Sequence, residues 1–145
     1  MATVASFNIE YFQYLSPTGE LVGDKIPAIA RDFDQLKNLV NQFDDSFNIY
    51  IHIDKKSKVS ESIVEQLLKY NNVISVEKKY KVNWGGFNHL KAYLFLCEKA
   101  LKNKENNYFH LITGHDYPIK SKEYFNELLN NTEEQKDYLD YFTMP

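Results

Sequence analysis

Two segments of the sequence place polar and charged side chains directly after an apolar stretch with the composition of a strand. Residues 48–53 alternate isoleucine with polar or aromatic residues and are followed by Asp54 and Lys56. Residues 108–113 are aromatic and β-branched and lead into Gly-His-Asp, which ends at Asp116. In open α/β sheets, ligands bind at the C-terminal ends of the strands. We therefore predict that Asp54, Lys56 and Asp116 lie at one edge of a sheet and line a binding site.

Each of these residues also has an ordinary structural explanation. Asp54 and Lys56 could contact the ribose or uracil edge and a phosphate of a nucleotide, or they could belong to a solvated loop. Asp116 lies two residues before Pro118, and aspartate in that setting often forms a turn. The convergence of several loops at one sheet edge favours a site over the separate structural explanations.

A third candidate is the turn formed by Trp84, Gly85 and Gly86 before the longest expected helix. Paired glycines allow the backbone to approach a ligand closely, and the N–H groups at the start of the helix can bind a phosphate. A tight turn in which Trp84 fills the core is an equally good interpretation of these residues.

The sequence lacks the familiar patterns of several enzyme classes. It contains no recognisable zinc spacing, no Ser-His-Asp or Gly-x-Ser-x-Gly arrangement, and no Walker or Rossmann glycine spacing. We expect no metal site. His52 and His110 lie in the middle of predicted strands, where a backbone partner explains a buried histidine better than metal binding or proton transfer does.

Composition narrows the range of partners. The 145 residues are 43% hydrophobic and 15% aromatic, which is enough for the core of one domain. The net charge of −3 argues against nucleic acid as a partner. Arg31 is the only arginine, so a phosphate site must use lysine, backbone N–H groups and hydroxyls. Cys97 is the only cysteine, which leaves no internal disulfide. No signal peptide or membrane-spanning run is visible, so the simplest location is cytoplasmic.

Apolar periodicity predicts helices that alternate with strands from Asp32, the expected cap of the first helix. The expected strands are 48–53, 73–76 and 108–113, with weaker patterns at 9–15 and 138–142. The longest helix should turn one stripe inward, formed by Phe87, Leu90, Leu94, Cys97 and Leu101. This order indicates an α/β fold with a mainly parallel sheet and flanking helices. We divide the chain into an atypical segment, 1–31, and a domain, 32–145.

Three ordered motifs resemble one family. They are Ile-His-Ile-Asp-Lys-Lys-Ser at 51–57, Val-Asn-Trp-Gly-Gly-Phe at 82–87, and the segment 108–121. From about residue 32 the chain is similar to the N-terminal half of the core-2/I-branching β-1,6-N-acetylglucosaminyltransferases, glycosyltransferase family 14, especially its bacterial members. The resemblance implies a GT-A-like fold and inverting transfer from a UDP-sugar, usually without a metal. It also implies that the nucleotide is bound by Asp54, Lys56, Trp84, Gly85 and Asp116.

Two parts of the chain depart from the family pattern. The family begins with an apolar strand, but Pro27 interrupts residues 26–31 here, and residues 9–23 look more like the N-terminal segment of a 2-oxo acid dehydrogenase α subunit. The family's catalytic base, a glutamate, and the basic residues that neutralise departing UDP are expected beyond Pro145. The catalytic residues are therefore unknown, and we expect a chain truncated before the base.

Two expectations about function follow. The first is the donor-binding half of a glycosyltransferase that moves N-acetylglucosamine or xylose from a UDP-sugar to a glycan or other hydroxyl acceptor, without a cofactor. The alternative is a non-catalytic interaction or scaffold module built on the same fold. In that case a half-sheet would expose an apolar face that favours self-association.

Overall fold

The computed structural model describes residues 2–9, 25–83, 86–113 and 116–130. Strands and helices alternate in the order β1 (Ala2–Ile9), α1 (Lys25–Val40), β2 (Phe47–Ile53), α2 (Glu61–Leu67), β3 (Val73–Glu77), α3 (Phe87–Ala100), β4 (Asn106–Thr113) and α4 (Lys122–Asn130). The four strands form one sheet in the order β3-β2-β1-β4. Each pairing in this sheet is parallel, which confirms the predicted α/β class and its parallel sheet. No helix within the described ranges is both long and apolar enough to cross a membrane.

Strand β1 lies in the centre of the sheet, although the sequence pattern indicated no strand before residue 9. It pairs with β2 on one side and with β4 on the other, so Asn8 aligns with both His52 and Thr113. The C-terminal ends of β2 and β4 therefore lie at the same edge of the sheet, as predicted. Residues 10–15 and 138–142, which carry the weaker strand patterns, lie outside the described residues.

Helix α1 begins earlier than predicted, at Lys25, so Asp32 lies inside the helix rather than at its start. Pro27 occupies the first turn, where its missing N–H removes no intrahelical hydrogen bond. Pro27 therefore belongs to the start of a helix and does not interrupt a strand. The division between residues 31 and 32 falls inside α1 and stays a prediction.

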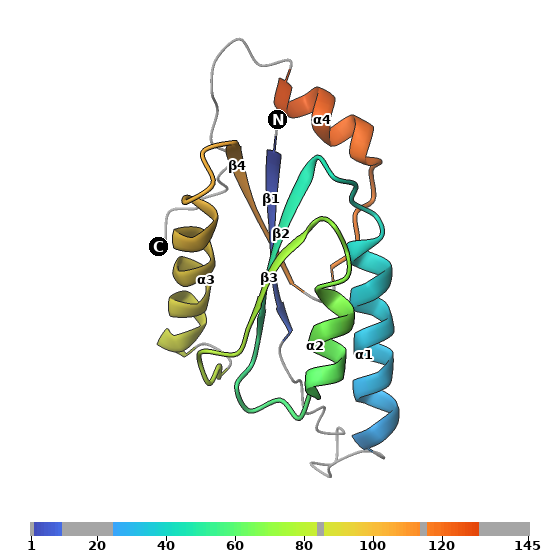
Figure 1. Cartoon of the computed structure of the whole chain (residues 1–145), viewed down its shortest axis with the longest axis vertical. Coiled ribbons are helices and arrows are strands. Elements are labelled where there is room, and N and C mark those ends of the chain that lie inside the picture. The colour runs from blue at the N-terminus through green and yellow to red at the C-terminus, as the bar shows by residue number, and fades with distance from the viewer. Residues whose placement is uncertain (1, 10–24, 84–85, 114–115, 131–145) are drawn as a thin grey trace, which may run out of the picture.

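An apolar core lies between β2 and the helices α1 and α2, which cover the same face of the sheet (Figure 1). Its fully buried side chains come from alternate positions of β2 and from the inner sides of the two helices: Leu36, Leu39, Val40, Ile49, Ile51, Ile53 and Leu67. The intervening residues Tyr50 and His52 are also buried. Strand β2 is thus covered on both faces, as is usual for the strands of a parallel sheet.

Helix α3 covers the other face of the sheet, but it turns a different side inward from the one predicted (Figure 1). Ala92, Leu96 and Ala100 are buried. The predicted inward stripe is instead largely exposed, with fractions between 49% and 68% for Phe87, Leu90, Leu94 and Leu101. Periodicity identifies the residues that share a side of a helix, but it does not tell which side meets the sheet. Alanine at two of the buried positions allows the helix to approach the sheet closely.

Among the residues that the structure describes, β4 is the last strand in the sheet order and is therefore an edge strand. The sequence predicted a buried strand, but Phe109, His110 and Leu111 are exposed. The prediction was wrong because apolar composition does not reveal the position of a strand within its sheet. Helix α4 follows Ser121, which caps the helix because its hydroxyl accepts a hydrogen bond from the Tyr124 N–H at 3.3 Å.

Candidate functional site

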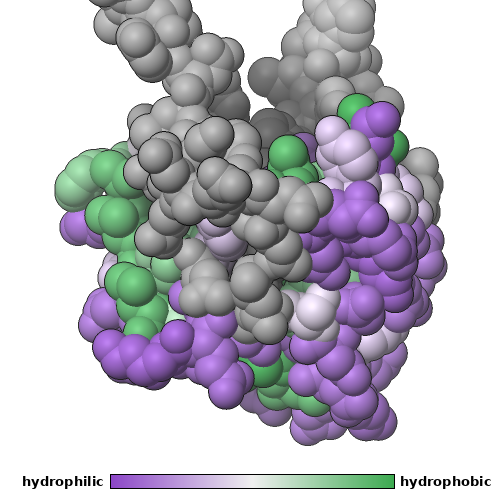
Figure 2. Space-filling view, turned by 90° about the horizontal axis from the view of Figure 1, so that it is seen from above, coloured by the Kyte–Doolittle hydropathy of each residue, from purple (hydrophilic) through white to green (hydrophobic). Residues whose placement is uncertain are grey.

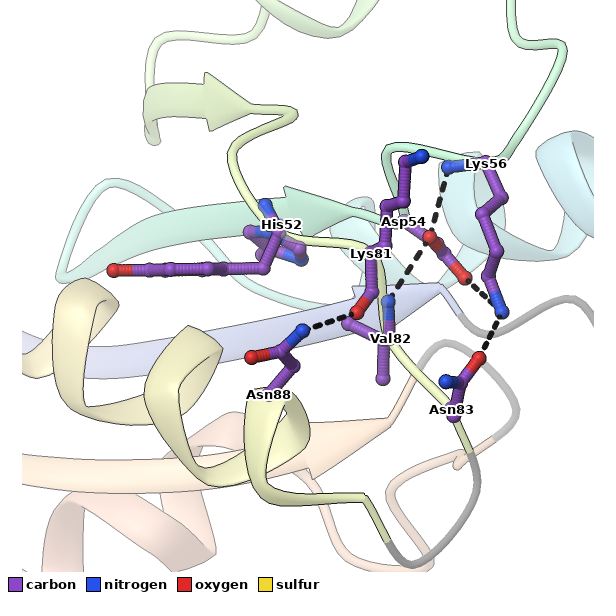
Figure 3. A network of polar contacts seen from close by, with 8 residues as sticks. His52, Asp54, Lys56, Lys81, Val82, Asn83 and Asn88 are labelled. Carbon is purple, nitrogen blue, oxygen red and sulfur yellow. Dashed lines mark hydrogen bonds and ion pairs between the residues drawn. The ribbon is translucent and has the colours of Figure 1, made fainter.

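Asp54 is the first residue after β2 and is almost completely buried, with 2% of its surface exposed. Its Oδ1 accepts hydrogen bonds from two backbone N–H groups, that of Lys56 at 2.8 Å and that of Val82 at 3.2 Å. The first bond closes the loop after β2, and the second reaches the segment that follows β3. Asp54 therefore holds two loops together at the C-terminal edge of the sheet (Figure 3).

The segment 80–83 is also held by His52. The Tyr80 N–H donates a hydrogen bond to His52 Nε2 at 3.1 Å. Because Nε2 accepts this bond, the imidazole is neutral and carries its proton on Nδ1. Burial lowers the pKa of His52, while the negative charges of Asp54 and Glu77 oppose the shift. The prediction that a backbone group satisfies this buried histidine is confirmed.

Lys56 carries an exposed positive charge beside this cluster. Its Nζ lies 3.4 Å from Asp54 Oδ2 and donates a hydrogen bond to Asn83 Oδ1 at 2.8 Å (Figure 3). The side chain is 45% exposed, so the ammonium group can also meet a ligand. Asn83 directly precedes Trp84 and Gly85, which were predicted to bind a nucleotide and lie outside the described residues.

Gly86 connects this segment to helix α3. Its N–H donates to the Asn83 carbonyl oxygen at 2.9 Å, and a Cβ added at Gly86 would lie 3.0 Å from the same oxygen. Its φ of −83° is accessible to any residue, so the close approach rather than the backbone conformation requires glycine. Asn88, in the first turn of α3, donates from Nδ2 to the Lys81 carbonyl oxygen at 3.0 Å. The N-terminus of α3 is thus attached to the same edge of the sheet.

The sequence analysis missed a group of lysines that follows β3. Glu-Lys-Lys-Tyr-Lys occupies 77–81, and three further lysines lie in 55–58 after β2. Because β2 and β3 are parallel neighbours, the two lysine runs meet at one edge of the sheet. Lys78 Nζ donates to the Ser57 carbonyl oxygen at 2.9 Å, and Lys79 Nζ lies 4.1 Å from the centre of an aromatic ring of α3. Lysine runs placed directly after two strands were the signal that could have revealed this group.

Asp116 is exposed and lies near β4. Although the His110 side chain is exposed, partial desolvation by the surrounding protein lowers its pKa, and the negative charge of Asp116 opposes that shift. His110 aligns through β1 with Ile49, so it belongs to the face of the sheet that α1 and α2 cover. Asp54, in contrast, is tied to the segment that leads into α3. The nucleotide-binding role of Asp116 stays a prediction.

The fold and this cluster define an α/β protein with a cationic candidate site at the C-terminal edge of a parallel sheet, the usual place for ligands in such sheets. Residues 28–145 match the family model of the Core-2/I-Branching enzyme, and the chain belongs to this family. It is therefore a member of a glycosyltransferase family, as the three sequence motifs indicated. No curated protein matches the sequence closely enough to extend this comparison.

Proposed function

We propose that the chain binds a UDP-sugar through the loops after β2 and β3, as the donor-binding part of an inverting glycosyltransferase with a GT-A-like fold. The observation that carries the proposal is the buried carboxylate of Asp54, which joins two lysine-bearing loops at one sheet edge. Family membership supports sugar transfer, and parallel α/β sheets generally bind their ligands at this edge.

In this proposal, lysine side chains and backbone N–H groups bind the diphosphate of the UDP-sugar donor. Lys55, Lys56 and Lys81 are exposed at this edge, and the positive end of the α3 dipole lies beside them. Positive charges in these positions stabilise the charge that develops on a departing diphosphate. We propose that they take the place of a metal ion in the transfer of N-acetylglucosamine or xylose to a hydroxyl acceptor.

Asp54 has an organising role in this proposal. Its Oδ1 is used by two backbone N–H groups, and its Oδ2 faces the ammonium group of Lys56. The carboxylate therefore holds the two loops in position and orients Lys56, and Lys56 contacts the ligand. Trp84, Gly85 and Asp116 remain proposed nucleotide contacts. Transfer also needs a carboxylate base for the acceptor hydroxyl, and we assign that role to no described residue.

Calorimetric titration with UDP-N-acetylglucosamine and UDP-xylose tests the site. Lys56→Ala should weaken binding roughly tenfold, because a charge-assisted contact is lost, and Asp54→Ala should weaken it at least as much. Lys102→Ala is the matched control, since this exposed lysine follows the far end of α3. Equal affinity of the wild type and all three variants would refute the site.

A second candidate function is supported by the exposed apolar face formed by Leu90, Leu94, Leu101, Phe109 and Leu111. The β4 members lie on the α3 side of the sheet, because Leu111 aligns through Ser6 with Tyr50. Figure 2 shows hydrophobic residues gathered on the side of the molecule where Figure 1 draws α3. Several large apolar side chains exposed on the same side of a molecule are typical of a protein–protein interface. The chain would then act as an interaction module that self-associates.

Light scattering over a range of concentrations tests the second candidate. The wild type should form dimers as its concentration rises, and Leu94→Ser should shift the equilibrium toward monomer. Leu68→Ser on α2 is the matched control, since this leucine is also 48% exposed but lies on the other face of the sheet. A wild type that stays monomeric at every concentration would refute self-association.

A further inference from the structure

The segment 80–83 is tied to the end of β2 by three hydrogen bonds that involve its backbone. The Tyr80 N–H donates to His52 Nε2 at 3.1 Å, the Tyr80 carbonyl oxygen accepts from the Lys55 N–H at 2.9 Å, and the Val82 N–H donates to Asp54. His52 differs from the other partners because an imidazole gains or loses a proton near neutral pH. The first of the three bonds can therefore change with pH while the others keep their partners.

We propose that His52 is a positioning residue for the candidate site: as a neutral acceptor it holds segment 80–83 against β2, and its protonation releases that segment and weakens nucleotide binding. A protonated Nε2 carries an N–H that faces the Tyr80 N–H, so two donors oppose each other where a hydrogen bond existed. The segment carries Asn83, the partner of Lys56 Nζ, so its release disturbs the lysine as well. The effect on nucleotide binding rests on the proposed function, whereas the tether itself does not.

The surroundings of His52 favour the neutral form. The charged groups packed around it come from its own strand, from β3 and the segment after it, and from α3: Asp54, Glu77, Lys79 and Lys99. Each of the two carboxylates forms an ion pair with a lysine, Asp54 with Lys56 and Glu77 with Lys99. Burial of the fully enclosed ring then outweighs their attraction and lowers the pKa of His52.

The sign of the pH dependence follows from this direction. A histidine whose pKa is lower in the folded state than in the unfolded state binds fewer protons in the folded state. The stability it contributes is complete above its ordinary pKa of 6.5 and is lost as the pH falls toward the lower folded-state value. The segment should therefore loosen as the pH falls below 6.5 toward the lowered pKa of His52, because protonation then competes with burial of the ring.

Two variants separate the hydrogen bond from the bulk of the ring. His52→Gln offers an oxygen near the position of Nε2 and does not titrate, whereas His52→Phe keeps a ring without an acceptor. The measurements are the exchange protection of the Tyr80 amide by NMR and the affinity for UDP-N-acetylglucosamine, both between about pH 7.5 and pH 5.5. The sugar nucleotide is chosen because its diphosphate diester does not titrate in this range. His110→Gln is the matched control, a histidine on β4 away from the segment.

Wild-type protection of Tyr80 and wild-type affinity should each fall at the lower pH by up to roughly tenfold, the largest change that a released histidine with the ordinary pKa of 6.5 allows at about pH 5.5. His52→Gln should hold both values within about twofold, His52→Phe should lose protection at every pH, and His110→Gln should behave as the wild type. Protection that is unchanged by pH and by His52→Phe would overturn the tether. Protection that changes without a change in affinity would overturn its link to the site. If the sugar nucleotide binds at no pH, the proposed function fails, and the Tyr80 measurements still decide the tether.

Discussion

The two faces of the sheet use the residues of β2 in different ways. On the face covered by α1 and α2, Ile49, Ile51 and Ile53 are 0% exposed and pack against apolar side chains of both helices. On the face covered by α3, Tyr50 and His52 are equally well buried, but their side chains contain polar atoms. His52 uses its polar atom to hold a loop that leaves the sheet. Burial on the first face thus serves stability, and burial on the second face serves the position of the candidate site.

The largest effect should come from a cavity in the apolar core between β2 and the helices α1 and α2. Ile51→Ala removes a fully buried side chain from β2, and we expect a loss of about 3 kcal/mol in the free energy of unfolding. Urea denaturation measures this loss. Leu94→Ala on the exposed side of α3 is the contrast, with an expected change below about 0.5 kcal/mol. Similar losses in both variants would contradict the burial of Ile51 and the exposure of Leu94.

A smaller effect should follow when the polar anchor is removed. Asp54→Ala leaves the Lys56 and Val82 N–H groups without their acceptor, and we expect a loss of about 2 kcal/mol in unfolding free energy. Asp54→Asn keeps an oxygen at this position and should lose less than half as much. Hydrogen exchange of the Val82 amide reports the same difference locally. Equal stability of the two variants would contradict the role of Oδ1 as an acceptor.

A substitution at Gly86 tests the close approach at the start of α3. The added Cβ of Gly86→Ala would lie 3.0 Å from the Asn83 carbonyl oxygen, which must move, at a cost of about 1 kcal/mol. The shift should appear in the amide resonances of Asn83 and in a weaker affinity for the sugar nucleotide. Lys91→Ala, on an exposed position of α3, should change neither quantity. Unchanged Asn83 resonances in Gly86→Ala would mean that the site tolerates a side chain there.

The smallest effect is expected from Asp44, which lies between α1 and β2 at the other end of the sheet. Hydrogen bonds from Ser46, together with Lys122, lower the pKa of Asp44 from 3.8 to about 2. A lowered carboxyl pKa stabilises the fold above pH 3.8, and that stabilisation is lost as the pH falls toward 2. The side chain is 42% exposed, so solvent screening keeps the contribution below about 1 kcal/mol.

Thermal unfolding of Asp44→Asn tests this expectation. The variant should be slightly less stable than the wild type near pH 6, and the difference should shrink as the pH falls from about 4 toward 2, because Asp44 becomes protonated over that range and is then uncharged like asparagine. Its affinity for the sugar nucleotide near pH 7 should equal that of the wild type. A difference in stability that grows as the pH falls would contradict the direction of the pKa shift.

Sequence patterns predicted the parts of the fold that depend on local periodicity. Isoleucine at every second position of 48–53 indicated a strand, and the structure confirms it. The polar residues of 54–57 at the end of that strand indicated a loop at the C-terminal edge. His52 was correctly interpreted, because a histidine between isoleucines in a buried strand needs a backbone partner.

Other parts depend on contacts between segments that are distant in the sequence. The stripe from Phe87 to Leu101 was correctly assigned to one side of a helix, but that side faces away from the sheet. Strand β4 is as apolar as a central strand, yet the sheet order places it at an edge. Strand β1 was overlooked because its residues show little alternation, and its pairing with β2 and β4 places it at the centre.

The sequence by itself determined which chemical groups this protein can bring to a ligand: lysines in place of arginines, and an aspartate directly after a buried strand. Only the tertiary structure decided how Asp54 is used. The pairing of β2 with β3 brings segment 80–83 to Asp54, and two backbone N–H groups then compete with water and ligand for its Oδ1. A buried carboxylate is stable only if it accepts hydrogen bonds from nearby donors. The two N–H groups lie next to Asp54 only after the sheet has formed.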